Sequence, residues 1–357
     1  MKTGNANLPL HGGKAPSWLF NRMVRLASAI VDIFLEDNDP AELLVKLSDP
    51  FWFQSLGCLL GFDWHSSGVT TTVCGALKEA VKGREKETGF FIAGGKGGAS
   101  RKTPKEIETF ADKIGIDASP LVYASKMSAK VDNTAIQDGY QLYHHCFFFT
   151  KKGEWAVVQQ GMNEDSRFAR RYHWFSKSMK SFIETPHTAI CCDNRGETLD
   201  MTADESKGAR NASTELSAQS LEFWAKEAKL ISNLELPARH QILVKDINSK
   251  YFYKIMEQTY RESPTNFEEL LSIKGVGPKT IRSLSLLSEL LYGEKASYKD
   301  PARFSFAHGG KDGIPYPVDR ETYDKTIDIL NGWINRARID LTEKKRASER
   351  LKRFLQN

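Results

Sequence analysis

The sequence predicts an α+β protein with a small antiparallel sheet in an N-terminal mixed domain and an all-helical C-terminal domain. Strand-like segments, rich in aromatic and β-branched residues, occur only in the middle of the chain. From residue 218 onward, apolar residues recur almost everywhere at helical spacing. With 357 residues, the chain also exceeds the usual size of one compact domain. We therefore expect a mixed domain at residues 1–195, a linker at 196–217 and a helical domain at 218–357.

The N-terminal part begins with a loop and continues with helices. Residues 1–16 are rich in glycine, proline and polar residues, whereas Trp18, Met23 and Ile30 belong to a run at helical spacing. A second helix is expected after Asp39, which is a good N-cap, with Pro40 at the first helical position. An aromatic core cluster at 51–53, a loop at 61–68 and a helix at 70–82 complete this part.

The middle part contains the predicted sheet. A short strand at 88–93 leads into a glycine-rich segment and then a helix near Thr103 and Pro104. Segments 143–150 and 154–161 are separated by the turn-like residues 151–153, which predicts a β-hairpin. Residues 188–192 form one more candidate strand. The polar segment 195–217 has few bulky apolar residues, which favours a linker.

The bulk composition excludes some classes of protein. A formal net charge of +5 is only mildly basic and does not by itself indicate a nucleic-acid partner. The odd number of cysteines, five, without repeated spacing argues against a disulfide framework, so we expect reduced and mostly buried thiols. The first residues do not look like a signal peptide, and no apolar run approaches about 18 residues. These features predict a cytoplasmic protein without a membrane partner.

A pair of helices joined by a glycine hairpin is predicted at residues 266–293, with the sequence NFEELLSIKGVGPKTIRSLSLLSELLYG. Phe267, Leu270 and Leu271 mark the apolar face of a short first helix. Gly275 and Gly277 permit the unusual backbone of the hairpin. Pro278 suits the first position of the second helix. The expected buried stripe of that helix consists of Ile281, Leu284, Leu287 and Leu291.

The hairpin has the properties of a phosphate site. Its backbone amides and the positive end of the second helix favour an anion, and Lys279 and Thr280 add a charge and a hydroxyl donor. The sequence resembles the helix-hairpin-helix motif of DNA repair and recombination proteins. That resemblance implies DNA as the partner, without sequence-specific readout. The residues expected to contact DNA are Gly275, Val276, Gly277, Lys279, Thr280 and Arg282. The alternative is an ordinary tight turn between two core helices.

The C-terminal tail, residues 334–354, is predicted to be one helix with an excess of basic residues. Lys344, Lys345 and Arg346 are therefore added to the expected DNA contacts, beside the hairpin. The alternative is that basic residues in a last helical turn only complement the helix dipole.

A catalytic site is implied by a second resemblance, which covers residues 266–330. The sequence PVDRETY at 317–323 resembles the segment that carries the catalytic aspartate in helix-hairpin-helix DNA glycosylases. The resemblance implies catalytic roles for Asp319 and for Lys279, the latter as a Schiff-base nucleophile in the abasic-lyase branch, with no metal. The gap between them is longer than usual, and the cysteine cluster of the lyase branch is absent. Asp319 would otherwise be a helix N-cap.

The β region offers a different chemistry. Asp132, Asp138, His145 and Glu154 lie in and around the predicted β-hairpin, and such residues hold Mg²⁺ or Mn²⁺ in metal-dependent nucleases. Adjacent His144 and His145 would face opposite sides of a strand, so at most one of them serves a given site. A basic cluster follows at residues 167–177. The alternative is a solvated β-hairpin over an aromatic core.

A second phosphate-binding candidate is the glycine-rich segment after the first strand. Its residues are Gly94, Gly95, Lys96, Gly97, Arg101 and Lys102. Glycines before a helix N-terminus can cradle phosphate, although the spacing of a Walker loop is missing. A basic surface loop is the alternative.

Nearly the whole chain resembles a family of archaeal and bacterial proteins that is classified as a domain of unknown function. The segments LPLHGGKAPSWLF, DWHSSGVTTT and YHHCFFF carry this resemblance, which implies no activity. Our leading hypothesis is a DNA-repair enzyme of the glycosylase or lyase kind, acting on damaged or structured DNA. The alternatives are a metal-dependent structure-specific nuclease and a non-enzymatic DNA-binding module.

Overall fold

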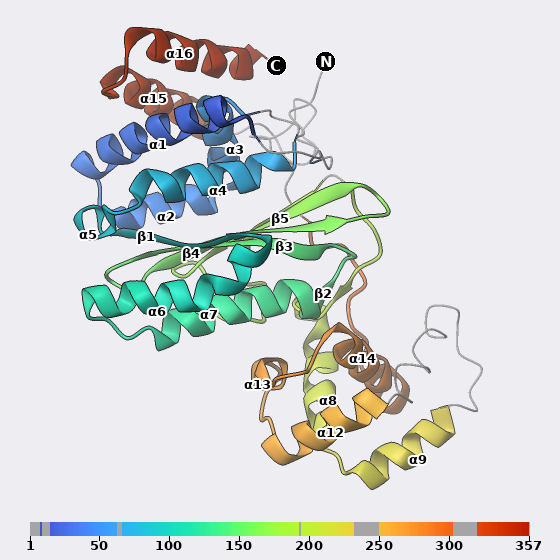
Figure 1. Ribbon diagram of the computed structural model, residues 1–357. Helices are drawn as coiled ribbons and strands as arrows, with labels where there is room; N and C mark the ends of the chain where they lie inside the picture. The colour runs from blue at the N-terminus through green and yellow to red at the C-terminus, as the bar shows by residue number, and fades with distance from the viewer. Residues whose placement is uncertain are drawn as a thin grey trace.

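The computed structural model describes residues 8, 15–62, 66–192, 194–231, 250–302 and 320–356. These residues form an α+β protein in which a five-stranded antiparallel sheet lies between two helical layers (Figure 1). The strand order is β1-β3-β4-β5-β6. The strands are β1 (Phe90–Lys96), β3 (Gln141–Thr150), β4 (Trp155–Asn163), β5 (Phe168–Phe175) and β6 (His187–Cys191).

The first helical layer covers one face of the sheet. It contains α1 (Ser17–Asp37), α2 (Pro40–Ser48), α3 (Pro50–Leu60) and α4 (Gly68–Val81), and the short α5 (Glu85–Thr88) leads into β1. Asp39 caps α2 by accepting from the amide of Ala41, as expected, and Asp49 caps α3 in the same way through Trp52. The apolar faces of these helices form one core with the sheet side chains Phe90, Cys146 and Phe148.

The second face is covered by α6 (Thr103–Ile114) and α7 (Ser119–Lys130), which follow a 3₁₀ turn, η1 (Gly97–Lys102). A π-helical turn, η2 (Val131–Ala135), then leads to β2 (Ile136–Gln137), which pairs with β7 (Leu199–Asp200). A second short 3₁₀ turn is η3 (Asp204–Ser206). The helices α8 (Lys207–Ser217), α9 (Leu221–Ile231), α12 (Lys250–Glu262), α13 (Phe267–Ser272) and α14 (Pro278–Tyr292) follow. Phe91, Trp174 and Leu284 belong to one apolar cluster, so these helices share their core with the sheet.

The last two helices return to the first layer. The ring of Trp333 on α15 (Arg320–Arg336) packs edge-on against Phe34 and Trp52, with ring centroids 5.3 and 5.5 Å apart. Arg350 on α16 (Leu341–Gln356) donates to the carbonyl of Leu59. These helices therefore lie on the far side of the sheet from α13 and α14 (Figure 1).

The prediction of a single helix at 334–354 is wrong, because the chain leaves the helix after Arg336 and restarts at Leu341. Asp340 explains the restart, since its carboxylate accepts from the amide of Glu343 at 2.9 Å, as an N-cap does.

The predicted β-hairpin is confirmed as β3 and β4, in which Phe149 pairs with Trp155. Strand β5 was not predicted, because Arg170, Arg171 and His173 were interpreted as part of a basic cluster beside a nuclease site. All three are fully buried in the sheet. Strands covered on both faces lose the alternation of polar and apolar residues by which a strand is found in a sequence.

The segment expected to be a linker, 196–217, contains β7, η3 and α8. Its small residues suit close helix packing: Ala209 and Ser213 on α8 are completely buried, and Ser213 Oγ lies 3.2 Å from Ser288 Oγ on α14. Buried Arg210 donates to the carbonyls of Met201 and Ala203. Low hydropathy here reflects small side chains rather than exposure. The division of the chain into domains stays a prediction.

All five cysteines are buried and none of them forms a disulfide. Cys191 belongs to the core of the first layer and Cys192 to that of the second, as expected for neighbours at the end of a strand. None of the helices in the described part of the chain is long and apolar enough to cross a membrane.

Candidate functional site

The predicted glycine hairpin joins α13 to α14. Gly275 has φ of +95°, the left-handed conformation that glycine adopts without strain. Gly277 is the N-cap of α14 with an extended backbone, φ −129° and ψ −175°, and Pro278 occupies the first turn. No side chain of the described residues caps this helix. The N-terminus of α14 is therefore presented by a rigid turn instead of being closed by a side chain.

Side chains of α12 hold the hairpin in place. Tyr251 Oη donates to the carbonyl of Gly275 at 2.8 Å, and a Cβ on Gly275 would lie 2.6 Å from Ile255 Cδ1. Val276 is fully buried between the helices. Among the described residues, a Cβ on Gly277 would meet only the carbonyl oxygen of Gly275, at 3.8 Å. The close-packed side of the turn is thus at Gly275, and the open side is at Gly277.

The predicted DNA contacts of the hairpin divide into exposed and buried groups. Lys279 is exposed, and so is Lys274 on the other side of the turn, which was not among the predicted contacts. Thr280 is 2% exposed, and Arg282 uses its Nε to donate to Gln137 at 2.8 Å. Thr280 and Val276 accordingly stabilise the turn, whereas the backbone of Gly277 and the two lysines are accessible.

Gln137 joins the hairpin to the two-stranded pair of β2 and β7. Its amide donates to the carbonyl of Pro278 at 2.8 Å and its carbonyl oxygen accepts from Arg282. Gln137 lies in β2, directly before Asp138 and shortly after Asp132. The N-terminus of α14 is thereby held beside the chain segment that carries both predicted carboxylates.

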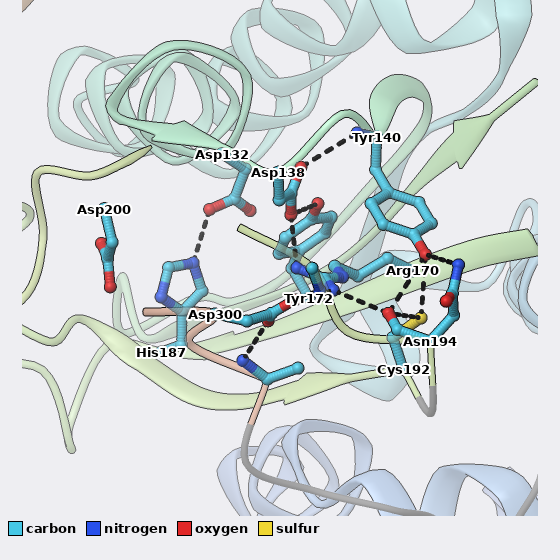
Figure 2. A network of polar contacts seen from close by, with 12 residues as sticks. Asp132, Asp138, Tyr140, Arg170, Tyr172, His187, Cys192, Asn194, Asp200 and Asp300 are labelled. Atoms are coloured by element: carbon cyan, nitrogen blue, oxygen red, sulfur yellow. Dashed lines mark hydrogen bonds and ion pairs between the residues drawn. The ribbon is translucent and has the colours of Figure 1, made fainter. Parts of the chain in front are cut away.

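Asp132 lies in the π-helical turn and is completely buried. Its Oδ1 accepts from His187 Nε2 at 2.5 Å (Figure 2). Its Oδ2 accepts from Gln159 Nε2 at 2.5 Å and from Trp174 Nε1 at 3.0 Å. The carboxylate of Asp132 thus accepts hydrogen bonds from three protein donors. We infer that it orients the side chains of these donors, above all the ring of His187.

A chain of hydrogen bonds continues from Asp132 into α7. Gln159 Oε1 lies 2.6 Å from His145 Nδ1, and His145 Nε2 lies 2.9 Å from Ser125 Oγ. The carbonyl oxygen of Gln159 can only accept, which places the ring proton of neutral His145 on Nδ1 and lets Ser125 donate to Nε2. Burial lowers the pKa of His145, which favours this neutral form. The chain is hydrogen-bonded throughout but buried.

Next to this cluster, Arg170 lies between two carboxylates (Figure 2). Its guanidinium donates to Asp138 Oδ2 at 2.9 Å and to Asp300 Oδ2 at 2.7 Å, and all three side chains are at most 7% exposed. Tyr172 Oη also donates to Asp138, at 2.7 Å. The ring of Tyr140 lies under the guanidinium, 4.4 Å from its carbon. This network ties β5 to the segments around residues 138 and 300.

The electrostatics of the network follow from its burial. Burial raises the pKa of Asp138, although Arg170 and Tyr172 act in the opposite direction. Burial opposes the charge of Arg170, but the carboxylates of Asp138 and Asp300 outweigh it, so the pKa of Arg170 is raised. Arg170 therefore stays charged, and the network functions as a buried ion cluster.

The residues of the nuclease hypothesis are not brought together. Asp132 and His145 are joined through Gln159, and Asp138 belongs to the neighbouring ion cluster. Glu154 lies at the turn between β3 and β4, where it pairs with Lys177 at 2.6 Å and accepts from Thr150. Glu154 therefore has other partners than Asp132 does, and both oxygens of Asp132 already accept hydrogen bonds from the protein. These contacts do not support a divalent ion shared by the predicted residues.

The glycine-rich phosphate candidate is part of the sheet and its edge. Gly94, Gly95 and Lys96 are in β1, and Gly97, Arg101 and Lys102 are in η1. The amide of Gly94 donates to Glu106 Oε2 at 2.7 Å, and Lys78 donates to the carbonyl of Gly94. The strand is longer than predicted because Gly94 and Gly95 pair with β3. The amide of Gly94, which a bound phosphate would need as a donor, is therefore already hydrogen-bonded to the carboxylate of Glu106.

The other predicted sites have different positions. Asp319 lies outside the described residues. Lys344, Lys345 and Arg346 are on α16, which lies across the sheet from α14, so the expectation that this basic tail lies beside the hairpin is wrong (Figure 1). The reason is the apolar contact of α15 with α1 and α3, which attaches the tail to the first layer.

Several residues of the site were missed by the sequence prediction. Gln159 and His187 were not singled out, and Arg170 was noticed only as part of the basic cluster at residues 167–177. Cys74, His144 and Cys146 form, among the described residues, a group whose ligand atoms all lie within 4.8 Å of one another. Their only sequence signal is a histidine and a cysteine two residues apart in a strand, since Cys74 is far away in the chain.

Comparison with known proteins identifies one family. Residues 4–318 match the family model described as "Protein of unknown function (DUF763)". No curated protein and no solved structure matches the chain.

Proposed function

For this chain, which belongs to the DUF763 family of proteins of unknown function, we propose that it binds DNA by contacting the sugar–phosphate backbone with the hairpin between α13 and α14. One observation carries the proposal. The positive-φ turn at Gly275 presents the uncapped N-terminus of α14 at the open position of Gly277, with exposed Lys274 and Lys279 on its two sides. Amides at a helix N-terminus together with lysines suit a phosphate group.

The surroundings of the hairpin support a long anionic ligand. Lys250 and Lys254 are exposed on α12, the helix whose Tyr251 holds the hairpin. Together with Lys274 and Lys279 they extend the positive surface beyond one phosphate. The resemblance to the helix-hairpin-helix motif favours DNA as this ligand. Such contacts position a protein on DNA without reading its sequence, so we expect affinity for any duplex sequence.

The test is the affinity for a fluorescently labelled DNA duplex, measured by anisotropy at several salt concentrations. Lys279→Glu should weaken binding by about tenfold or more, and it should also reduce the slope of log affinity against log salt concentration by about one. The substitution should not disturb folding, because an acidic residue suits the first turn of a helix. Lys345→Glu, the same change on α16, is the matched control and should leave the affinity nearly unchanged.

Three outcomes contradict the proposal. The first is that wild-type protein binds the duplex and Lys279→Glu binds it with the same affinity and salt slope. The second is that Lys345→Glu weakens binding more than Lys279→Glu, which would assign the interface to α16. A failure of wild-type protein to bind any duplex at low salt would also refute it.

An abasic-site lyase is a second candidate, because Lys279 is exposed in the first turn of α14, at the proposed DNA surface. A lysine that attacks the sugar forms a Schiff base that borohydride traps on the DNA. Trapping in the presence of EDTA supports this activity, and Lys279→Arg should abolish trapping while it retains DNA affinity. Cleavage that requires Mg²⁺ would instead support the nuclease hypothesis, and binding without cleavage would support a non-enzymatic module.

A further inference from the structure

Two thiols and an imidazole gather between α4 and β3, on the sheet face opposite to Asp132. Cys74 lies on α4, and His144 and Cys146 lie two residues apart on β3, so their side chains share one face of the strand. The two Sγ atoms and a ring nitrogen of His144 all lie within 4.8 Å of one another. All three residues are at most 1% exposed.

His144 has an unusual environment for a buried histidine. Neither Nδ1 nor Nε2 has a hydrogen-bond partner in the described structure. Its neighbour His145 has a partner at each nitrogen, namely Gln159 and Ser125. Burial of an imidazole without any partner costs free energy that a native structure normally avoids. Burial also lowers the pKa of His144 to about 3, so the ring is neutral and both a lone pair and an N–H are present.

We propose that Cys74, His144 and Cys146 bind a thiophilic transition-metal ion, with Zn²⁺ as the expected occupant. Thiolate and neutral imidazole are the ligands that Zn²⁺ prefers, with bonds of about 2.3 Å to sulfur and about 2.0 Å to nitrogen. Ligand atoms around such an ion lie roughly 3.5 to 4 Å apart, which the observed cluster reaches with small side-chain movements. Three protein ligands leave the fourth position of Zn²⁺ for a non-protein ligand.

The surrounding residues hold the cluster in place. Thr70 lies one helical turn before Cys74 on α4, and its hydroxyl donates to Gln160, the residue that pairs with His144 across β3 and β4. Arg171 donates to Gln54 Oε1 at 2.9 Å and is close enough for its charge to favour the thiolate of Cys74, although burial raises the pKa of that thiol. A cation in the cluster acts in the same direction as Arg171, because metal binding deprotonates cysteine.

This site is independent of DNA binding and of the divalent ion of the nuclease hypothesis. Mg²⁺ and Mn²⁺ prefer oxygen ligands, and the cluster offers none. His144 faces α4, whereas Asp132 and His145 face the opposite layer. A metal at this position joins α4 to β3 within the core of the first layer.

The first experiment measures metal in the wild-type protein. Protein purified without chelators from Zn²⁺-supplemented medium should contain one equivalent of zinc per chain by elemental analysis. X-ray absorption at the zinc edge should show two sulfur neighbours at about 2.3 Å and a nitrogen neighbour at about 2.0 Å. These readouts need no substitution. A shell of oxygen and nitrogen alone, or less than a tenth of an equivalent of metal after supplementation, overturns the proposal.

The second experiment assigns the ligands. Cys74→Ser and Cys146→Ser should each reduce zinc affinity by more than about 100-fold, since even changes outside the first ligands cost 10–100-fold. Cys58→Ser is the matched control, because Cys58 is also a buried cysteine outside any disulfide but lies on α3. Zinc retained at full affinity in both ligand variants, or a Cys74–Cys146 disulfide found by mass spectrometry of the non-reduced protein, refutes the site.

Discussion

At the residue scale, Gly94 shows why the glycine-rich segment belongs to the sheet. Its φ is +92°, and a Cβ at this position would lie 2.2 Å from the carbonyl oxygen of His145 and 2.5 Å from Thr103 Oγ1. The sequence shows the glycines but not the strand and helix that approach them. A phosphate-binding loop and a close-packed strand both require glycine, and only the tertiary contacts distinguish the two.

Gly94→Ala should therefore destabilise the protein by about 3 kcal/mol, the sum of a backbone clash and an unfavourable φ. Gly98→Ala is the control, because a Cβ there has open space and Gly98 has no positive φ. Chemical denaturation measures both changes. Equal stability of the two variants would show that the packing at Gly94 is not as tight as the structure indicates.

The buried histidines make stability depend on pH. Burial, with a contribution from Arg171, lowers the pKa of His173 well below its ordinary value. The folded state then stays neutral while the unfolded state binds a proton below about pH 6.5, so unfolding takes up a proton and stability falls with decreasing pH. Each such group contributes a slope of up to about 1.4 kcal/mol per pH unit below pH 6.5.

His173→Phe should reduce the pH slope of the unfolding free energy between about pH 6.5 and pH 5 by the contribution of one histidine. The slope is the appropriate quantity, because the variant also leaves the carbonyl of Leu47 without its donor and is less stable at every pH. Urea denaturation at four pH values gives the slope. A slope equal to that of wild type would mean that His173 titrates alike in both states.

At the element scale, β5 is notable because it places two arginines in the interior. Arg170 and Arg171 are neighbours on this strand and lie on opposite faces, one with Asp138 and Asp300 and the other with Gln54. Each arginine has a partner that is distant in the sequence. The strand was not predicted because it contains these two arginines. Their burial is explained by contacts with residues that come close only in the folded chain.

The ion cluster should be sensitive to the loss of one partner. Asp138→Asn removes a charge beside buried Arg170 and should cost about 3 kcal/mol of unfolding free energy. Lys152→Gln breaks the exposed ion pair with Asp39, which should cost much less, because water screens an exposed pair. Thermal and urea denaturation compare the variants. If Asp138→Asn were as stable as Lys152→Gln, the cluster would contribute no more than a surface pair.

At the scale of the whole molecule, both cores are built on the same sheet. The first layer recruits α15 and α16 from the end of the chain, and the second layer is continuous with α8 and α12–α14. The sequence predicted the α+β class, the central hairpin and the helical C-terminal half correctly. It did not predict that the basic tail returns to the first layer, because the partners of Trp333 are about 300 residues away and no local pattern indicates them.

Trp333→Ala should test this arrangement. The loss of a large side chain buried against Phe34 and Trp52 should destabilise the first layer by about 3 to 5 kcal/mol. DNA affinity at a temperature where the variant is folded should not change, because the hairpin lies across the sheet (Figure 1). A variant as stable as wild type would contradict the packing of α15 on α1 and α3.

The candidate site was predicted in part. The hairpin, with Gly275, Gly277 and Pro278, has a short local pattern, so its two helices and their turn were found from the sequence. Leu291 was expected in the buried stripe but is 36% exposed, because α14 ends at the edge of its core. The chain from Asp132 through Gln159 to Ser125 joins segments that are distant in the sequence, so its members show no common spacing.

The most direct test of DNA binding by the hairpin compares Gly277→Asp with Gly277→Asn. Position 277 has open space for a side chain and the extended backbone of an N-cap. Aspartate and asparagine are both good N-cap residues, so both variants should be at least as stable as wild type. They differ in charge, because only aspartate places a carboxylate where a phosphate would bind. Duplex affinity, measured by anisotropy on both folded variants, should fall about tenfold or more in Gly277→Asp relative to Gly277→Asn. Equal affinity of the two variants would contradict binding at the N-terminus of α14.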